Sequence, residues 1–414
     1  MSEVVVTGMG AVTSLGHDVP RFWAGLRDGE VAVHEAPWAD ANHFAWWSSV
    51  RDFDPGDWVS PAVASGSDLF TLLALAASEQ ALQEAGLAEP DPRRTGVVLG
   101  TSMGGTRALL KAQHALETGG PDAVDRKTMI QIWPNMAAAQ IAMKRGLHGP
   151  SLTFCTACAS SLDAIGSAAD LIRSGRADVV IAGGAEGGFG LPDGSPDGAF
   201  VPAVFHGQAA YGVTTGDAAR LRASIPFDVD RTGIVVGEGA GMVVLESRTY
   251  AERRGAAVLG SVRGYASLAD AHHPSSPEPN GTWEAETMEQ ALASAGLTAA
   301  DVDAVLAHGT STPKGDTAEI RAINRVYRGE PVKVTSIKGN LGHTAGAAGA
   351  MSAIAALNAL REGVLPHTAG TTKVDPEADF EVVTTRPAEI ASAHVQVNAF
   401  GFGGQNASLV LAAE

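Results

Sequence analysis

The chain has 414 residues, and its 29 Lys and Arg against 46 Asp and Glu give a formal net charge of −17. With 45% hydrophobic residues it can bury a large core, which excludes a wholly disordered chain, and its length suits one large α/β unit or two fused halves. The negative charge, without any long Lys/Arg run, argues against nucleic acid as a partner.

Short β-branched runs alternate with Ala/Leu-rich segments along the chain. Buried strands are predicted at residues 4–6, 97–99, 152–154, 179–181, 242–245, 302–306 and 395–397. Helices are predicted at residues 69–85, 160–173, 313–327 and 344–361, and the first of them follows the cap candidates Ser67 and Asp68. An antiparallel pair of strands is expected near the C-terminus. This alternation predicts a layered α/β architecture.

A polar segment, residues 246–255, separates two strand–helix series. We therefore expect two halves, residues 1–250 and 251–414, related by the order of their elements and not by a repeated sequence. Residues 187–223 are irregular and rich in Gly, Pro and Asp. A loop of that length inside a compact domain is usually a lid, a partner-binding surface or disorder.

The N-terminus and the cysteines indicate the compartment. Residues 1–6 lack the basic and apolar regions of a signal peptide, and no apolar stretch reaches the roughly 20 residues of a membrane span. We therefore expect a cytoplasmic protein without a membrane partner. The 2 cysteines, Cys155 and Cys158, could form only one disulfide bond, which would not stabilise a chain of this size. We therefore expect them to be reactive or simply buried.

Cys158 is the first candidate for a functional residue. A predicted strand ends just before it and a helix begins just after it, so unpaired backbone N–H groups and the helix dipole are expected to favour a nucleophilic thiolate. A small buried structural residue is the alternative. A C-x-x-C redox or metal site is a weaker one, because no further cysteine supplies zinc ligands.

Two histidines lie at comparable places. His308 follows the strand predicted at 302–306, and His343 precedes the helix predicted at 344–361. A single histidine is most often structural, but three reactive side chains at strand-to-helix junctions indicate a site, because ligands bind at the strand ends of α/β sheets. Two imidazoles beside a cysteine suit a developing enolate or oxyanion, so carbon–carbon bond formation on a thioester is the indicated chemistry.

Two charged residues accompany the histidines. Lys338 lies on the approach to His343, and Glu319 lies one helix turn beyond Asp316 in the segment after His308. A Lys338–Glu319 pair could fix the imidazoles electrostatically. Two solvated charges on helix surfaces are the alternative.

A glycine-rich segment near the C-terminus completes the candidates. Residues 398–406 interleave glycines with Phe400 and Phe402. Such a loop can bring its backbone close to a ligand and donate N–H groups while the aromatic rings exclude water. The alternative, a glycine-rich hairpin turn, does not explain both Phe residues.

Four motifs together resemble the β-ketoacyl synthases, namely residues 156–161, 308–316, 338–343 and 398–404. With residues 7–10, 226–228 and 237–241, the resemblance covers almost the whole chain. It implies the thiolase fold, in which two related α/β halves pack as a five-layered α-β-α-β-α sandwich, and it implies a dimer.

The resemblance also implies a discrete elongating enzyme of fatty-acid or type II polyketide biosynthesis. Cys158 would accept the acyl chain from the phosphopantetheine of an acyl carrier protein. His308 and His343 would assist decarboxylation of malonyl-carrier protein and stabilise the enolate, which attacks the Cys158 thioester to give a β-ketoacyl product. Lys338 and Glu319 would support the histidines. The family requires no metal and no diffusible cofactor.

The family's binding positions map onto further residues. The backbone N–H groups of Cys158 and Phe402 would form the oxyanion hole, and Thr310 and Thr312 would hold the pantetheine arm. The acyl pocket and its gate are assigned to Met103, Ile234, Phe400 and Phe402. Family members commonly carry a Phe at the position of Ile234, so the gating here is expected to differ.

Carrier-protein docking needs a local basic patch, because carrier proteins are acidic and this chain is acidic too. Basic residues that family members often carry before the first predicted helix are missing, since residues 60–68 contain no Lys or Arg. Arg126 and Lys127 are the best candidates by position, and a solvated surface pair is the alternative reading.

Related classes differ at the catalytic positions. Thiolases use a second catalytic Cys and initiating synthases use Cys-His-Asn, so His308 and His343 favour the elongating type. Chain-length-factor subunits replace the nucleophile, so Cys158 favours the catalytic subunit, acting as a homodimer or beside a chain-length-factor-like partner. A partner subunit with little activity of its own is the alternative. A nicotinamide dehydrogenase is rejected, because the dinucleotide motif's third glycine is Thr13 here.

Overall fold

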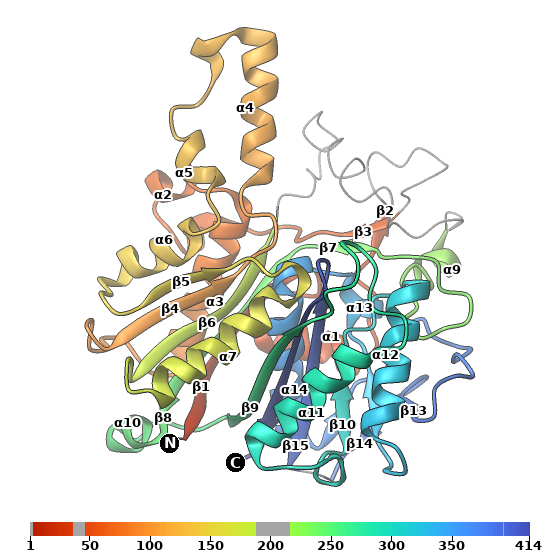
Figure 1. Cartoon of the computed structure of the whole chain (residues 1–414). Coiled ribbons are helices and arrows are strands. Elements are labelled where there is room, and N and C mark those ends of the chain that lie inside the picture. The colour runs from red at the N-terminus through yellow and green to blue at the C-terminus, as the bar shows by residue number, and fades with distance from the viewer. Residues whose placement is uncertain (1–2, 36–45, 188–215, 392) are drawn as a thin grey trace.

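The computed structural model describes residues 3–35, 46–187, 216–391 and 393–414. Most of the loop predicted at 187–223 therefore lies outside the described residues. Within the described part, an 11-stranded sheet has the order β13-β11-β10-β15-β16-β9-β1-β8-β6-β4-β5 (Figure 1). Its N-terminal strands are β1 (Val4–Thr13), β4 (Thr95–Gly100), β5 (Ser151–Phe154), β6 (Val179–Glu186) and β8 (Gly239–Ser247). Its C-terminal strands are β9 (Gly260–Ala269), β10 (Ala304–Leu306), β11 (Lys333–Thr335), β13 (Glu381–Val382), β15 (His394–Gly401) and β16 (Gln405–Ala412).

The two halves of the sheet repeat one pattern of strand directions. β5, β4 and β6 run parallel, and β8 and β1 follow antiparallel. In the other half β11, β10 and β15 run parallel, and β16 and β9 follow antiparallel. β1 pairs with β9 where the halves meet. The antiparallel pair expected near the C-terminus is thus β15 and β16.

Helices cover both faces of each half of the sheet (Figure 1). The outer helices are α3 (Leu69–Glu84) and α6 (Met136–Arg145) on one side, and α11 (Thr282–Ala295) and α12 (Pro313–Val326) on the other. Between the halves lie α7 (Ser160–Arg173) and α14 (Ala348–Glu362). Residues 348–360 of α14 are all buried, as a helix that is apolar on every side requires. These five layers are the thiolase fold that we expected.

The N-terminal glycines have a packing role. A Cβ on Gly8 would lie 2.0 Å from the carbonyl oxygen of Ala81, and one on Gly10 would lie 1.9 Å from that of Ala77. Both contacts are impossible, so the two glycines let α3 pack directly on β1. The structure therefore agrees with the rejection of a dinucleotide-binding loop there.

One strand prediction was wrong in its burial. We expected residues 152–154 to form a buried strand, but β5 is the edge of the sheet and Leu152 is 43% exposed. β5 pairs only with β4, so its other side has no neighbouring strand among the described residues. An apolar edge that a single chain leaves open is a surface that a second subunit can cover.

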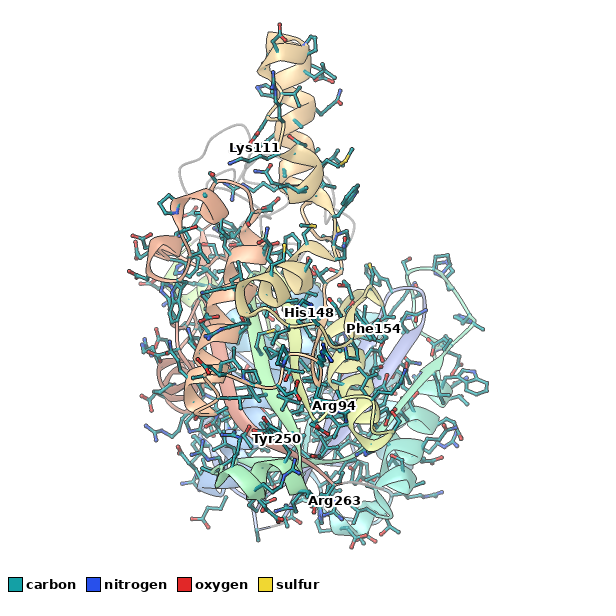
Figure 2. The ribbon with its side chains drawn as sticks, turned by 90° about the vertical axis from the view of Figure 1, so that its left-hand side faces the viewer. Arg94, Lys111, His148, Phe154, Tyr250 and Arg263 are labelled. Carbon is teal, nitrogen blue, oxygen red and sulfur yellow. The ribbon has the colours of Figure 1, made fainter. Side chains whose placement is uncertain are left out.

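An arm rises from the same side of the molecule (Figures 1 and 2). It consists of α4 (Thr106–Gly119), a short turn and α5 (Thr128–Ile132), and Ala108 is the one buried residue of α4. Its large exposed apolar side chains are Leu109, Leu116, Met129, Ile130 and Trp133. Among the described residues, six of the eleven large exposed apolar side chains lie on this arm and on β5, the sixth being Leu152. Across that described part, no helix combines the length and apolar character needed to cross a membrane.

Candidate active site

The three predicted reactive residues lie at junctions of strands and helices. Cys158 lies in the single turn η3 (Ala157–Ala159), between β5 and α7. His308 follows β10 directly, and His343 lies between α13 (Lys338–Leu341) and the turn η6 (Ala345–Ala347), which leads into α14. The predicted helix start at 344 was thus a few residues early, because a 3₁₀ turn precedes the α-helix. All three residues lie where the sheet ends, as the sequence pattern predicted.

Each junction contains a non-glycine residue in the left-handed region. The φ angles are +50° at Ala157, +67° at Ser311 and +44° at Ala345. The Ser311 hydroxyl accepts a hydrogen bond from the backbone N–H of Ile225 at 3.0 Å, which helps to hold one of these conformations. Such backbone costs about 1–3 kcal/mol per residue and persists where the surrounding structure enforces it, typically at functional sites.

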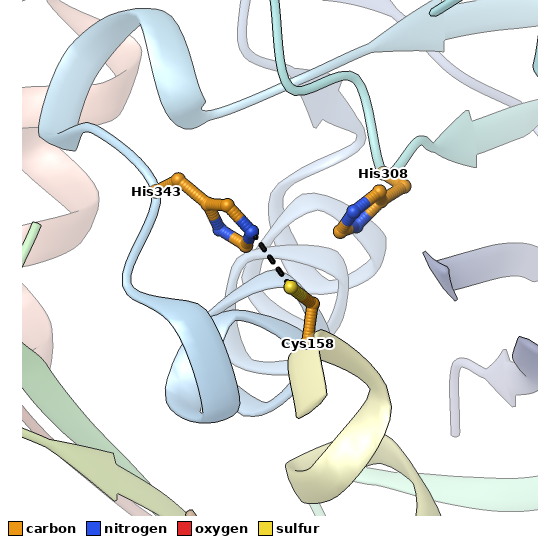
Figure 3. Close-up of side chains that lie close together, drawn as sticks. All are labelled: Cys158, His308 and His343. Carbon is orange, nitrogen blue, oxygen red and sulfur yellow. Dashed lines mark hydrogen bonds between the residues drawn. The ribbon is translucent and has the colours of Figure 1, made fainter. Parts of the chain in front are cut away.

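The tertiary structure brings the three side chains together (Figure 3). The Cys158 Sγ lies 3.0 Å from His343 Nε2. The rings of His308 and His343 are 5.3 Å apart at an interplanar angle of 83°, and one ligand atom of each residue lies within 4.8 Å of the others. A single carbonyl or enolate oxygen can therefore meet both imidazoles beside the sulfur.

A cavity of about 830 Å³ opens onto this group. It is lined by all the residues assigned to substrate binding, which are Met103, Ile234, Thr310, Thr312, Phe400 and Phe402. Ile234 and Phe400 are buried, whereas Phe402 is 44% exposed. The volume suits a small-molecule ligand or an extended chain.

The glycine-rich segment approaches the cysteine turn closely. A Cβ on Gly401 would lie 2.9 Å from the carbonyl oxygen of Thr156 and 3.0 Å from the backbone N of Cys158, so this position needs a glycine. The backbone N–H groups of Phe402 and Cys158 reach the sulfur and act to lower its pKa. The two N–H groups that we expected to form the oxyanion hole thus lie near the sulfur, and their role as oxyanion donors stays a prediction. The segment is also a glycine-rich hairpin turn, as in the alternative, because residues 402–404 connect β15 to β16.

The expected thiolate was wrong for the free enzyme. Burial raises the pKa of Cys158 to about 11, although Lys338 and the two backbone N–H groups act in the opposite direction. Removing the thiolate from water costs more free energy than the Lys338 charge and the two N–H groups supply by stabilising it. At neutral pH Cys158 is thus a thiol hydrogen-bonded to an imidazole, and it needs a base to become a nucleophile.

This thiol pKa predicts a pH dependence of alkylation. Because the thiolate fraction grows about tenfold per pH unit below the pKa, the rate of carboxamidomethylation by iodoacetamide should keep rising from pH 7 to about pH 10 without a plateau. Peptide mass mapping separates Cys158 from Cys155. A rate at Cys158 that levels off near pH 7 would mean that the thiolate forms at neutral pH after all.

Both imidazoles are neutral. The pKa of His308 lies well below its ordinary value because of burial and the nearby Lys338 and His343. Burial and Lys338 lower the pKa of His343 in the same direction. Neither buried Nδ1 has a hydrogen-bond partner among the described residues. The two rings therefore offer an N–H donor or a free nitrogen lone pair and not a positive charge.

Lys338 and Glu319 hold His308 by its backbone. Glu319 accepts hydrogen bonds from the N–H groups of His308 and Gly309, both at 2.7 Å, and the Lys338 ammonium donates to the carbonyl oxygen of His308. Within the described chain, no ion pair of 4 Å or less joins the two residues, but each charge acts on the pKa of the other, as expected of an electrostatic pair. Their support of the imidazoles stays a prediction. The His308 peptide groups lie between the two charges and bind both. Burial raises the pKa of Glu319 to about 7 and lowers that of Lys338 to about 8.

Sequence reasoning missed several residues at this site. Asp316 is fully buried and accepts hydrogen bonds from the N–H groups of Thr310 at 3.0 Å and Phe227 at 2.8 Å, so it fixes the threonine turn. Further lining residues that it missed are Ser275, Ser276, Glu284 and Lys314. Residues 270–281 have no helical or strand periodicity, so nothing local could place Ser275 and Ser276 at the site.

The two docking candidates lie on the arm, outside the cavity. Arg126 and Lys127 are exposed, and the Lys127 ammonium donates to the Ser65 hydroxyl at 2.8 Å. Lys127 therefore lies against the 60–68 segment, which itself carries no basic residue.

Comparison with known families identifies the chain. Residues 1–251 match the family described as "Beta-ketoacyl synthase, N-terminal domain", and residues 259–372 match "Beta-ketoacyl synthase, C-terminal domain". The chain belongs to the β-ketoacyl synthase family. This synthase is therefore an acyltransferase of the condensing type, as the motifs predicted. The domain boundary at residue 250 stays a prediction, and in the structure it falls within α10 (Arg248–Arg254).

Curated relatives cover the synthase almost completely. It is 35% identical over 416 residues to "3-oxoacyl-[acyl-carrier-protein] synthase 2" of Vibrio harveyi, covering 99% of this chain and 98% of the relative. It is 36% identical over 413 residues to "Nodulation protein E" of Rhizobium meliloti, covering 98% of each.

Solved structures share the whole fold. The ishigamide ketosynthase/chain length factor matches with a TM-score of 0.89 at 33% identity, covering 100% of this chain and 99% of the other. A β-ketoacyl synthase from Burkholderia phymatum STM815 matches with a TM-score of 0.89 at 32% identity over 100% of both chains. A type II polyketide acyl-carrier protein in complex with its ketosynthase matches with the same TM-score at 26% identity, over 100% of both chains.

Proposed function

We propose that this synthase catalyses the decarboxylative Claisen condensation of malonyl-carrier protein with an acyl chain held on Cys158. The product is a β-ketoacyl-carrier protein that is longer by two carbons. The observation that carries the proposal is a thiol 3.0 Å from one neutral imidazole, with a second imidazole facing the same point of one cavity.

The first step loads the acyl chain. The Cys158 sulfur attacks the thioester carbonyl of an acyl-carrier protein, and its proton passes to His343 Nε2 at 3.0 Å. The N–H groups of Phe402 and Cys158 bind the oxyanion. When the tetrahedral intermediate collapses, the pantetheine sulfur leaves, takes the proton from the imidazole, and departs with the carrier as a thiol.

The second step forms the carbon nucleophile. The bond from the α-carbon of the malonyl thioester to its carboxylate breaks, carbon dioxide leaves, and the electron pair forms an enolate. His308 donates an N–H hydrogen bond to the enolate oxygen. His343 donates a second one as the tautomer that carries its proton on Nε2, which the neutral ring reaches by exchanging its Nδ1 proton for one on Nε2. Because both rings are neutral and buried, these donors act where water does not compete with them.

The third step joins the carbons. The enolate α-carbon attacks the carbonyl of the Cys158 thioester, and the new bond forms as the electron pair moves to the carbonyl oxygen. The oxyanion contacts the same two N–H groups as in the first step. The intermediate then expels the Cys158 thiolate, which takes a proton from water by way of His343 and so regenerates the free enzyme.

The cavity contains groups for both parts of the substrate. We assign Thr310 and Thr312, whose hydroxyls are 2.9 Å apart, to the polar pantetheine arm. We assign Met103 and Ile234 to the acyl chain, with Phe400 beside His308 at a ring distance of 6.0 Å. Whether Ile234 gates the pocket, as a Phe does in many relatives, stays a prediction.

Shortening Met103 should lengthen the accepted acyl chains. A Met103→Ala variant removes three side-chain heavy atoms from the cavity wall, so the preferred chain should grow by about two to four carbons, since each buried methylene contributes about 0.8 kcal/mol. Loading of Cys158 from a series of acyl-carrier proteins, read by intact mass, measures this. An unchanged series would exclude Met103 from the acyl pocket.

Acyl carrier protein is the proposed partner, and we assign its docking to Arg126 and Lys127. Reversing both charges, Arg126→Glu with Lys127→Glu, should raise the KM for carrier-bound substrates about tenfold and leave kcat unchanged, because rim charges act mainly on association. An N-acetylcysteamine thioester, which lacks the carrier, should be unaffected. Arg328→Glu, at an exposed arginine in the turn that follows α12, is the control. A KM change of equal size for the small thioester would contradict docking there.

We propose that a second subunit, either an identical chain or a chain-length-factor-like partner, packs on the apolar arm and the β5 edge. The alternative role, a partner subunit with little activity of its own, gives no reason for the complete Cys–His–His group. The cytoplasmic location stays a prediction.

The deciding experiment follows the protein by intact mass. The purified synthase is mixed with an acyl-carrier protein, and malonyl-carrier protein is then added with and without EDTA, because a thiol and two imidazoles are also a zinc-binding set. We expect an acyl adduct on Cys158 that converts to a β-ketoacyl product in both conditions. If no adduct forms alone or with a chain-length-factor-like protein, the proposed function is wrong.

A further inference from the structure

Glu186 is a buried acid that the proposed mechanism does not use. It is the last residue of β6 and is 0% exposed, and it does not line the cavity. Its Oε1 accepts hydrogen bonds from the Thr101 hydroxyl at 3.1 Å and the Met103 N–H at 3.0 Å. Its Oε2 accepts from the Ser102 N–H at 2.8 Å, the Ser102 hydroxyl and the Gly346 N–H at 2.9 Å.

These donors come from two different walls of the active-site cavity. Residues 101–103 follow β4, and Ser102 and Met103 line the acyl side of the cavity. Gly346 belongs to η6, the turn that begins two residues after His343. A Cβ on Gly346 would lie 2.7 Å from Glu186 Oε2 and 2.5 Å from the Ser102 N, so the glycine allows the two walls to meet at the carboxylate.

The carboxylate therefore binds both walls. β4 and β6 belong to the N-terminal half of the sheet, whereas η6 leads into α14 from the C-terminal half. Three of the five donors are backbone N–H groups, which can only donate and therefore favour the ionised form. Burial acts in the opposite direction and raises the pKa of Glu186 above its usual range. No Lys or Arg of the described residues forms an ion pair with Glu186, so these hydrogen bonds are what favours its charged form.

The charge also acts on the two cysteines. Burial is the main cause of the raised pKa of Cys158 and of Cys155, and the Glu186 charge adds to it in both cases. The same side chain thus touches the acyl wall, supports the turn next to His343 and opposes ionisation of the nucleophile.

We propose that Glu186 is a positioning residue that fixes the Ser102–Met103 wall against the turn next to His343. It thereby couples acyl-chain selectivity to the reactivity of Cys158. This inference rests on the proposed function. Removal of the carboxylate frees the wall from the turn. Acyl chains of different length are then distinguished less well, and the Cys158 sulfur no longer faces a nearby negative charge.

Glu186→Gln is the direct variant, since it keeps the size and removes the charge. An amide nitrogen brings donors where Ser102, Met103 and Gly346 already donate, so at least one contact breaks. Glu246→Gln is the matched control. Glu246 is also 0% exposed and accepts hydrogen bonds from Thr7 and Arg254, but it pairs across the sheet with Val179, at the opposite end of β6.

Ser102→Ala is the second variant, and it removes one donor while keeping the charge. All variants are made in a Cys155→Ala background, so that alkylation reports Cys158 alone. Two quantities are measured, the ratio of Cys158 loading from dodecanoyl- and hexanoyl-carrier protein, and the rate of iodoacetamide alkylation at pH 8. Thermal unfolding verifies that each variant is folded.

We expect Glu186→Gln to change the loading ratio by about fivefold or more. It should also alkylate about fivefold faster, because lowering a thiol pKa by one unit raises its thiolate fraction about tenfold. Ser102→Ala should change the ratio without accelerating alkylation, and Glu246→Gln should change neither.

A folded Glu186→Gln enzyme with an unchanged ratio and rate would overturn the proposal, and so would equal changes in Glu246→Gln. If Glu186→Gln does not fold, an unchanged ratio in Ser102→Ala overturns it. If the parent enzyme forms no acyl adduct, the proposed function has failed. The alkylation rates of Glu186→Gln and Glu246→Gln then decide the inference, and equal rates reject it.

Discussion

Replacing Cys158 with alanine is expected to abolish condensation, with turnover lower by about 10⁴-fold or more, because the acyl chain then has no covalent attachment. Decarboxylation of malonyl-carrier protein should continue, since His308 and His343 remain and the missing side chain does not contact the enolate oxygen. Intact mass of the protein and release of carbon dioxide measure the two reactions separately.

Cys155→Ala is the matched control for this variant. Cys155 is the other cysteine of the chain, and it lines the same cavity while its sulfur contacts the Ser102 carbonyl oxygen at 3.5 Å. It has no imidazole partner among the described residues, so its loss should leave the acyl adduct in place. An adduct that survives in Cys158→Ala and disappears in Cys155→Ala would reverse the assignment of the nucleophile.

Replacing each histidine should separate the two half-reactions. His308→Ala should still load the acyl chain, because His343 is the ring beside the sulfur at 3.0 Å. Condensation should nevertheless fall by about 10²- to 10³-fold, the usual cost of one donor to a developing oxyanion. His343→Ala should slow both loading and condensation, because it removes the base as well as a donor.

Single-turnover loading and steady-state product formation measure these effects. His394→Ala is a suitable control, since this histidine lies on β15 at the opposite end from the glycine-rich segment and outside the cavity. Equal loading rates in His308→Ala and His343→Ala would show that the Cys158–His343 contact does not supply the base. A group other than His343 would then have to accept the proton of the Cys158 thiol during loading.

Much of the fold could be predicted from local sequence. The Asp68 cap, the helix from Leu69 and the helix from Ser160 to Arg173 lie where the pattern placed them, because capping side chains and apolar periodicity act within a few residues. β5 was misjudged, because the burial of a strand depends on its place in the sheet, and an apolar run looks the same at an edge and at the centre.

The sequence by itself determined the family and the three candidate reactive residues. Cys158, His308 and His343 each lie in a short motif at the end of a predicted strand, and such motifs can be recognised without the fold. Only the tertiary structure decided how these groups work. Burial raises the thiol pKa, and Lys338 and Glu319 both bind the backbone of His308, which lies between their charges. The role of Glu186 was also invisible in the sequence, because its donors lie about 85 and 160 positions away along the chain and meet only when both halves of the fold are packed.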